Sequence, residues 1–226
     1  MANKKIKDYK KLLQKKYRRE FKLFLVEGDH LISEAKANGE VVDMMTMNPE
    51  KEGLILAPFI YKRLSETESP QDSIAVVKIP APKEIGKRVL ALDGVQDPGN
   101  VGTLIRTAVA FGFTDVIVKG ADVYSAKAIR SSQGAIFKIN VTQTKDISNF
   151  FEDKQVLGAL LDKEASVYSD VKLKEEFILV LGNEGQGISE EVQEKLTDKV
   201  YIPIKFESLN VASAGAILLN EYKKSS

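Results

Sequence analysis

The chain has 226 residues, 43% hydrophobic and 29% charged, a composition typical of a globular protein with one large domain or two smaller ones. It contains no cysteine, which excludes disulfides and thiolate metal sites and favours a reducing compartment. No apolar run approaches the ~20 residues that cross a membrane, and the chain does not start with a secretory-type apolar segment. A cytoplasmic protein is therefore expected.

A dense block of positive charge occupies residues 4–22, where the acidic residues are Asp8 and Glu20. Apolar residues recur in this block every three or four positions, from Ile6 to Leu13, which predicts an amphipathic helix. A basic helix face can neutralise phosphates and release their counterions, so the block is predicted to bind RNA. The alternative is a helix face that is merely solvated. The predicted RNA-binding residues of the block are Lys10, Lys11, Lys15, Lys16 and Arg18.

The next part of the chain is predicted to form a small α/β unit. Short apolar runs indicate strands at residues 24–26, 41–45, 54–57 and 74–77. Helical spacing predicts one helix that starts after Gly28 and ends at Gly39, and a second, short helix at 59–64. The polar, proline-containing segment 79–84 has the composition of a linker. The predicted domains are therefore residues 1–84 and 85–226.

Regular alternation of strands and helices begins at Arg88. The predicted strands are residues 89–92, 115–118, 138–141, 156–161, 177–181 and 200–204. The predicted helices are residues 100–111, 147–151 and 211–219, a helix or loop at 126–137, and a short helix that Ser189 can cap. Such alternation indicates a mostly parallel sheet with helices on both faces.

Three of these strands end in polar or glycine-rich turns, and ligands of open parallel sheets usually bind beyond the carboxyl ends of strands. The first turn leads into a helix that Asn100 can cap, with Arg106 two turns further on. The second, residues 182–187, has neither the glycine spacing of a dinucleotide site nor the Lys-Ser/Thr of a phosphate loop, which disfavours both kinds of nucleotide enzyme. The third follows Pro203. Taken singly, these features are better explained by a helix cap, a surface cation and a turn without a ligand.

Together, the three turns resemble the three motifs of the SpoU/TrmH family, RNA ribose 2′-O-methyltransferases of the SPOUT class. The matching segments are Asn100-x-Gly102-x-x-x-Arg106, Gly182-Asn183-Glu184-Gly185-x-Gly187, and Ile202-Pro203 followed by Ser208-Leu209-Asn210-Val211. The resemblance covers nearly the whole chain. It implies an α/β fold with a parallel sheet and a C-terminal trefoil knot, preceded by a small L30e-like domain that binds the RNA substrate. It also implies a homodimer whose sites are completed across the interface.

The resemblance further implies S-adenosyl-L-methionine as cofactor and assigns residues by motif position. The implied cofactor contacts are Gly182, Asn183, Gly187, Ile202 and Leu209. The implied catalytic residues are Arg106, Asn100, Glu184, Ser208 and Asn210. Arg130 lies in a segment that resembles one on the RNA-facing side of the family's site. The loop at 204–207 is shorter than is usual in the family. No metal is implied, and no group of His, Asp and Glu has metal-ligand spacing.

The implied reaction transfers a methyl group from a sulfonium to a ribose 2′-hydroxyl, and much of its acceleration can come from positioning the two reactants. Mechanisms described for the family assign the removal of the hydroxyl proton to the arginine at the position of Arg106. Because an arginine pKa exceeds ~12, gripping a phosphate or stabilising the forming alkoxide is at least as reasonable a role. The predicted substrate is a 23S-type ribosomal RNA. A tRNA substrate, and a non-catalytic RNA-binding or ribosome-assembly factor, are the alternatives.

Overall fold

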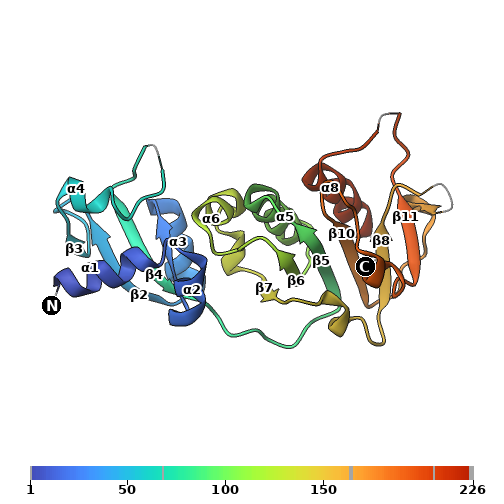
Figure 1. Cartoon of the computed structure of the whole chain (residues 1–226), viewed down its shortest axis with the longest axis horizontal. Coiled ribbons are helices and arrows are strands. Elements are labelled where there is room, and N and C mark those ends of the chain that lie inside the picture. Colours follow the sequence, from blue (N-terminus) through green and yellow to red (C-terminus); the bar gives the residue numbers. More distant parts are fainter. Residues whose placement is uncertain (1, 68, 163–164, 206, 224–226) are drawn as a thin grey trace.

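The computed structural model describes residues 2–67, 69–162, 165–205 and 207–223. Two β-sheets lie side by side along the long axis of the molecule, with the N-terminal sheet at one end (Figure 1). Within the described residues, the first sheet has four strands in the order β1-β4-β2-β3, and the second has seven in the order β7-β6-β5-β10-β8-β11-β9. The connection between the sheets, residues 79–87, forms no helix or strand, and the predicted domain boundary falls within it.

The N-terminal sheet is mostly antiparallel, because β1 and β2 both pair with β4 in opposite directions. Its strands are β1 Leu23–Glu27, β2 Val41–Thr46, β3 Leu54–Ile55 and β4 Ser73–Lys78. The helices around it are α1 Ala2–Lys11, α2 Lys15–Phe21, α3 Asp29–Asn38 and α4 Pro58–Tyr61. The helix predicted from Ile6 to Leu13 is α1, which ends two residues early. Leu12 is buried just beyond its end, where the chain turns into α2.

The second sheet is parallel at every described pairing, which confirms the prediction of a mostly parallel sheet. Its strands are β5 Arg88–Val95, β6 Asp115–Gly120, β7 Asn140–Gln143, β8 Gln155–Ala159, β9 Ser166–Val167, β10 Phe177–Gly182 and β11 Asp198–Tyr201. The central strand β10 is buried along its whole length, as expected for a parallel strand covered on both faces. The strand predicted at 200–204 ends at Tyr201, because Pro203 has no N–H for the ladder.

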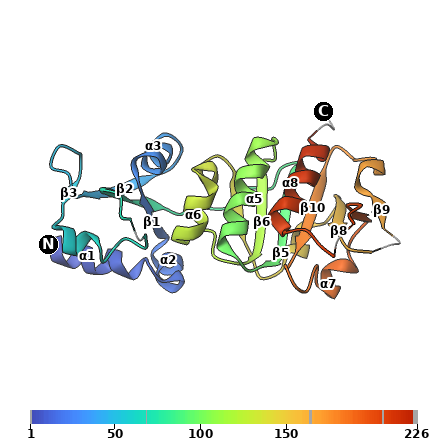
Figure 2. The same ribbon diagram turned by 90° about the horizontal axis from the view of Figure 1, so that it is seen from above.

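Helices cover both faces of this sheet. One face carries α5 Pro98–Ala110, α6 Ala126–Ser132 and α8 Val211–Tyr222, which lie next to one another (Figure 2). The other face carries the 3₁₀ turn Ile147–Phe150 and α7 Glu190–Gln193, whose apolar side chains join a buried cluster with residues of β5, β8 and β10. Two further 3₁₀ turns are Ala135–Phe137 and Tyr168–Asp170.

Two expected helix caps differ in the structure. Asn100 lies inside α5, and Asp97 is the cap, since its carboxylate accepts a hydrogen bond from the Gly99 N–H. Pro98 suits the first helical position, where no N–H donor is needed, and this moves the start of the helix ahead of Asn100. Ser189 does precede α7, but its side chain makes no cap bond there.

The two domains share a continuous apolar interface. Phe24 of β1 packs against Tyr124 of the second domain, with ring centroids 4.8 Å apart, and against Phe137, at 6.2 Å. Buried residues of β1, α3 and β4 belong to the same core cluster as those of α5 and α6. The N-terminal domain is therefore held at a defined position on the α6 side of the parallel sheet (Figures 1 and 2).

Candidate functional site

The three motifs meet at the carboxyl edge of the parallel sheet. Strands β5 and β10 are neighbours, with Asp93 opposite Gly182, so the turns that follow them lie together. The Glu184 carboxylate accepts a hydrogen bond from Asn100 Nδ2 at 2.9 Å, and Asn100 Oδ1 accepts one from Asn210 Nδ2 at 3.2 Å. One chain of side-chain hydrogen bonds therefore joins a residue from each motif.

Glu184 and Asn210 also bind backbone groups of their surroundings. Glu184 accepts from the N–H of Gln96 at 3.3 Å, and the Asn210 side chain caps α8 by accepting from the N–H of Ala212 at 2.8 Å. Partial burial raises the pKa of Glu184, but the hydrogen bonds from Asn100 and from backbone amides outweigh it and hold the pKa below its ordinary value of 4.5. Glu184 is therefore ionised at neutral pH and is a weak base.

The glycine-rich turn after β10 is tightly closed. Asn183 and Gly187 exchange two backbone hydrogen bonds of 2.9 Å each, and the Asn183 side chain accepts from the N–H of Gly185 at 2.9 Å. A Cβ at Gly182 would lie 2.2 Å from the carbonyl carbon of Gly187, so only glycine fits there. Gly187 has a φ of +73°, in the left-handed region that favours glycine.

A cavity of about 370 Å³ lies beside this turn. All five residues predicted to contact a cofactor line it, as do Glu184 and Ser208 of the predicted catalytic set. Asn100 and Asn210 lie next to it through their hydrogen bonds to each other and to Glu184. A larger cavity, about 1190 Å³, lies under the connection 79–87 and includes Arg88 at the start of β5, so it is at the opposite edge of the sheet from the motifs.

Arg106 is exposed on α5 and does not line the cavity. Six residues beyond Asn100, it stands about 9 Å further along the helix axis. Among the described residues it makes no hydrogen bond or ion pair. Its guanidinium is therefore open to an anion from solution or from another molecule.

Asp93 is a buried carboxylate near the carboxyl end of β5 that sequence reasoning missed. Ser189 donates to it from both its N–H and its hydroxyl, at 2.7 Å each, and Lys119 Nζ lies 2.8 Å away. Burial raises the pKa of Asp93, but Lys119 and Ser189 outweigh burial and lower it below 3.8. The one signal in the sequence was an acid at the end of an apolar strand, directly before Gly94.

The cations of the N-terminal block lie on α1 and α2, but they differ in their availability. Lys10 and Lys16 are exposed, whereas Lys11 pairs with Asp8 at 2.7 Å and Lys15 Nζ donates to the carbonyl of Gly120 at 3.3 Å.

Arg18 differs from the rest of the block, because it is only 6% exposed and pairs with Asp122 at 2.7 Å. The prediction that Arg18 binds RNA is wrong in this structure, since its guanidinium is buried against the second domain. Arg130 is half-buried on α6.

Some expectations concern absences or residues outside the described ranges. The shortened loop at 204–207 includes Phe206, which is outside the described residues. Over the described part of the chain, no three His, Cys, Asp or Glu side chains form a group that could hold a metal ion. The helices of that part are each too short or too polar to span a bilayer.

Comparisons with known sequences cover both domains. Residues 87–220 match the sequence model of the SpoU rRNA Methylase family, and residues 3–75 match that of the MRM3-like substrate binding domain. The 23S rRNA (guanosine(2553)-2′-O)-methyltransferase RlmP of Bacillus subtilis is 37% identical to this chain, over 96% of this chain and 95% of that protein.

Comparisons with solved structures extend over the same length. A TrmH-family protein from Porphyromonas gingivalis has a TM-score of 0.87 at 36% identity, covering 98% of this chain and 97% of that one. The SpoU methyltransferase AviRb from Streptomyces viridochromogenes, solved in complex with AdoMet, has a TM-score of 0.85 at 25% identity and covers 97% of each chain.

Proposed function

The chain belongs to the SpoU rRNA Methylase family, and from this we propose that it transfers a methyl group from S-adenosylmethionine to a ribose 2′-hydroxyl of 23S ribosomal RNA. The observation that carries the proposal is the chain of hydrogen bonds from Glu184 through Asn100 to Asn210, which ties the three motifs together at one cavity. The full-length similarity to a 23S rRNA enzyme supports ribosomal RNA over tRNA as the substrate.

The cavity suits S-adenosylmethionine by size and chemistry. Its volume of about 370 Å³ lies within the range of ~300–1,000 Å³ typical of small-molecule sites. The closed turn at Gly182 to Gly187 offers backbone groups, while Ile202 and Leu209 supply apolar surface. When bound, the cofactor supplies an electrophilic methyl group on its sulfonium.

The protein then has to orient the ribose hydroxyl and stabilise the charge that develops when its proton leaves. Glu184 is poorly suited as the base, because its pKa is lowered and its carboxylate is held by Asn100. A guanidinium is a poor general base, because arginine side chains are not deprotonated in proteins. We therefore assign Arg106 to gripping an RNA phosphate or stabilising the alkoxide, and Asn100 and Asn210 to holding the motifs in place.

A homodimer and a cytoplasmic location are part of this proposal. Arg106 does not line the cavity of its own chain, which is the arrangement expected if a second copy completes each site. The C-terminal trefoil knot is likewise a prediction from family membership. Lys10, Lys11, Lys15, Lys16 and Arg130 remain the proposed RNA contacts, without Arg18.

The test is methyl transfer from labelled S-adenosylmethionine to ribosomal RNA taken from a strain that lacks the gene. We expect the wild type to label 23S RNA at one ribose, found by mapping 2′-O-methyl positions. Arg106→Ala should slow transfer by about 100-fold or more, the usual cost of a lost electrostatic contact in a transition state, while calorimetry shows unchanged cofactor affinity. Lys174→Ala, an exposed cation near the opposite edge of the sheet, is the matched control.

Two results would contradict the proposal. Near-wild-type turnover by Arg106→Ala would remove the assigned role of this residue. A wild type that binds ribosomal RNA but neither binds the cofactor nor labels any ribose would favour the non-catalytic RNA-binding alternative.

A further inference from the structure

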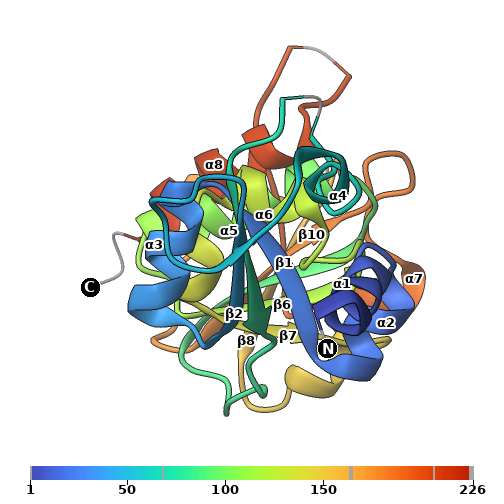
Figure 3. The same cartoon turned by 90° about the vertical axis from the view of Figure 1, so that its left-hand side faces the viewer.

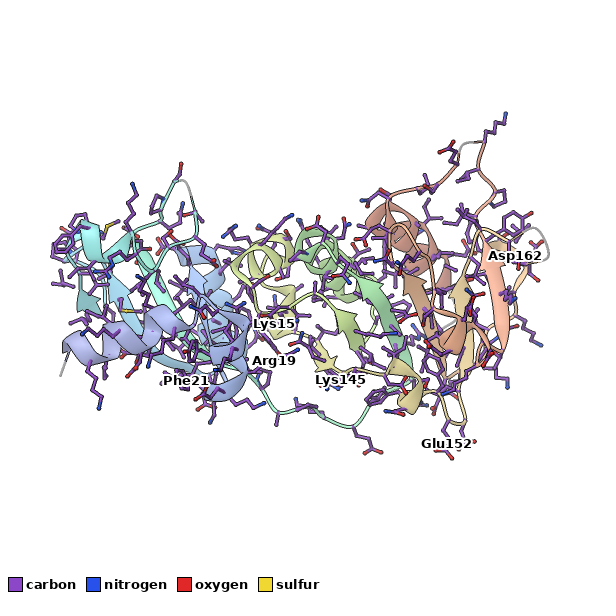
Figure 4. The ribbon with its side chains drawn as sticks, in the orientation of Figure 1. Lys15, Arg19, Phe21, Lys145, Glu152 and Asp162 are labelled. Atoms are coloured by element: carbon purple, nitrogen blue, oxygen red, sulfur yellow. The ribbon has the colours of Figure 1, made fainter. Side chains whose placement is uncertain are left out.

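Three cations lie around the place where α2 meets the ends of β6 and β7 (Figure 4). They are Lys15 and Arg19, one turn apart on α2, and Lys145, which follows β7. Lys15 Nζ donates a hydrogen bond to the carbonyl of Gly120 at the end of β6, and Gln143 Nε2 of β7 donates one to the carbonyl of Ala121, at 3.2 Å. We call the surface formed by Lys15, Arg19 and Lys145 the α2–β7 seam.

The charge of the seam is largely uncompensated. Arg19 and Lys145 are exposed, and in the described part of the chain they form no ion pair or hydrogen bond. Lys15 donates only to a neutral carbonyl. Of the acids beside these cations, Glu20 and Asp146 are exposed, and Asp146 already accepts two bonds from Ser148. The seam therefore attracts anions.

A buried ion pair fastens α2, which carries two of the three cations, to the second domain. Arg18 lies between Lys15 and Arg19 in the chain, and its guanidinium binds one oxygen of Asp122 through Nε at 3.0 Å and Nη2 at 2.7 Å. Asp122 follows β6, so this pair fastens α2 to the loop at the carboxyl end of that strand. A cationic surface that is already in place loses little conformational entropy when it binds a ligand.

The seam lies at the same edge of the sheet as the three motifs. β6 is separated from β10 by β5 alone, so at ~4.8 Å per strand the ends of β6 and β10 are about 10 Å apart. Contacts bridge that distance, since Lys119 of β6 pairs with Asp93 of β5, which binds Ser189 beyond the glycine-rich turn. Figures 2 and 3 agree that α2 and α7 lie on one side of the molecule.

We infer that the α2–β7 seam binds the phosphodiester backbone of the substrate RNA, on the strand that runs between the target ribose and the N-terminal domain. A polyanion suits the seam better than a single phosphate, because the cations are spread over two elements and none of them has to give up an ion pair to take a separate phosphate. The inference rests on the proposed function for the identity of the strand. It replaces the buried Arg18 by Arg19 as a contact and adds Lys145, which lies far from the N-terminal block in the sequence.

The test compares two triple variants with the same change of charge. Lys15→Gln, Arg19→Gln and Lys145→Gln remove the seam. Lys83→Gln, Lys172→Gln and Lys174→Gln remove three exposed lysines from the opposite edge of the sheet. Fluorescence anisotropy with a labelled fragment of 23S RNA from the deletion strain gives affinity between 50 and 200 mM salt, roughly the range over which phosphate contacts change affinity most.

The seam variant should bind RNA about 10-fold to 100-fold more weakly at low salt, and its log–log salt slope should be shallower by about 2, since each phosphate contact contributes roughly 0.7. Its KM for RNA should rise while cofactor affinity is unchanged. The control variant should keep the wild-type slope. A double variant, Arg19→Gln with Lys145→Gln, covers the case in which the triple variant folds poorly, because it leaves the Lys15 bond intact. Its salt slope should be shallower than that of the wild type by about 1.4, two contacts at roughly 0.7 each.

A seam variant with the affinity and slope of the control would overturn the inference. That result is distinct from failure of the proposed function. If the wild type binds RNA through the seam but labels no ribose, the proposed methyl transfer is wrong and the proposed RNA-binding surface is supported. If the wild type labels 23S RNA and the seam variant labels and binds it equally well, the proposed RNA-binding surface is wrong and the proposed methyl transfer is supported.

Discussion

At the scale of single residues, the site depends on polar groups that satisfy one another before any ligand arrives. Asn100 donates to Glu184 and accepts from Asn210, and the Asn183 amide closes the glycine-rich turn from within. Each loop is therefore held by side chains of the others, and little reorganisation is needed on binding. The lowered pKa of Glu184 follows from this role and argues for positioning over proton transfer.

A substitution at Asp93, which does not line the cavity, tests whether polar contacts hold the loops of the site in place. In Asp93→Asn the side chain keeps its shape, but the charge that binds Lys119 and Ser189 is lost. We expect the free energy of unfolding to fall by about 1–3 kcal/mol at pH 7, the usual cost of disrupting a buried hydrogen-bonded group. Cofactor affinity should also weaken, because Ser189 ends the glycine-rich turn.

The pH dependence of the free energy of unfolding provides a control for the Asp93→Asn prediction. Its pKa in the folded state lies below the ordinary 3.8, so the carboxylate stabilises the fold above that pH, and the contribution is lost as the pH falls through the folded-state pKa. Urea unfolding at pH 7 and near pH 3 should therefore show the gap between wild type and variant shrinking at acid pH. A gap of equal size at both pH values would contradict the assigned role.

At the scale of elements, the close approach of backbone segments decides where glycine is required. Gly102 of α5 sits against α6, where a Cβ would lie 2.4 Å from the carbonyl oxygen of Ala128. Gly182 ends β10 against the backbone of Gly187. In both places the obstacle is backbone rather than a flexible side chain, so the structure cannot adjust cheaply.

The turn after β10 contains its own matched pair of glycines. In Gly182→Ala the new Cβ meets backbone at 2.2 Å, and we expect a loss of about 1–3 kcal/mol in the free energy of unfolding. In Gly185→Ala the nearest atom is Asn183 Oδ1 at 3.7 Å, an ordinary contact, so the change should stay within about 0.5 kcal/mol. Denaturant midpoints measure both. A loss for Gly182→Ala as small as that for Gly185→Ala would contradict the prediction and mean that the turn can rearrange at little cost.

At the scale of the whole molecule, the N-terminal domain and the parallel sheet share one buried interface. Aromatic packing around Phe24 supplies apolar area, and the Arg18–Asp122 pair sets how α2 meets the second domain. Because the pair is nearly buried, removing one partner leaves the other charge uncompensated.

A double-mutant cycle measures this pair. Arg18→Met should lower the free energy of unfolding by about 3–5 kcal/mol, the typical cost of breaking a buried pair. Asp122→Asn keeps the acceptor for the Tyr124 N–H, and the double variant should be little worse than Arg18→Met alone. The expected coupling is about 2 kcal/mol or more. Purely additive losses would show that the two side chains do not depend on each other.

Local pattern was sufficient to predict much of this protein. Apolar runs separated by turn residues located the described strands other than β9 Ser166–Val167, and they indicated the parallel class of the second sheet, because strand propensity and alternation act over a few residues. The motif residues around Asn100, Gly182 and Asn210 were found from their types and spacing, and the structure brings them to one cavity. Secondary-structure ends were less accurate, as the cap of α5 at Asp97 instead of Asn100 and the end of β11 at Tyr201 show.

Contacts between distant parts of the chain were decided only by the tertiary structure. The sequence does not reveal that β10 lies between β5 and β8, or that Asp93 binds a residue 96 positions away. It placed Arg18 among the solvent-facing cations, whereas packing buries it against Asp122. The physical reason is that periodicity reports which side of an element is apolar, while the partner of a buried charge depends on the position of every other element.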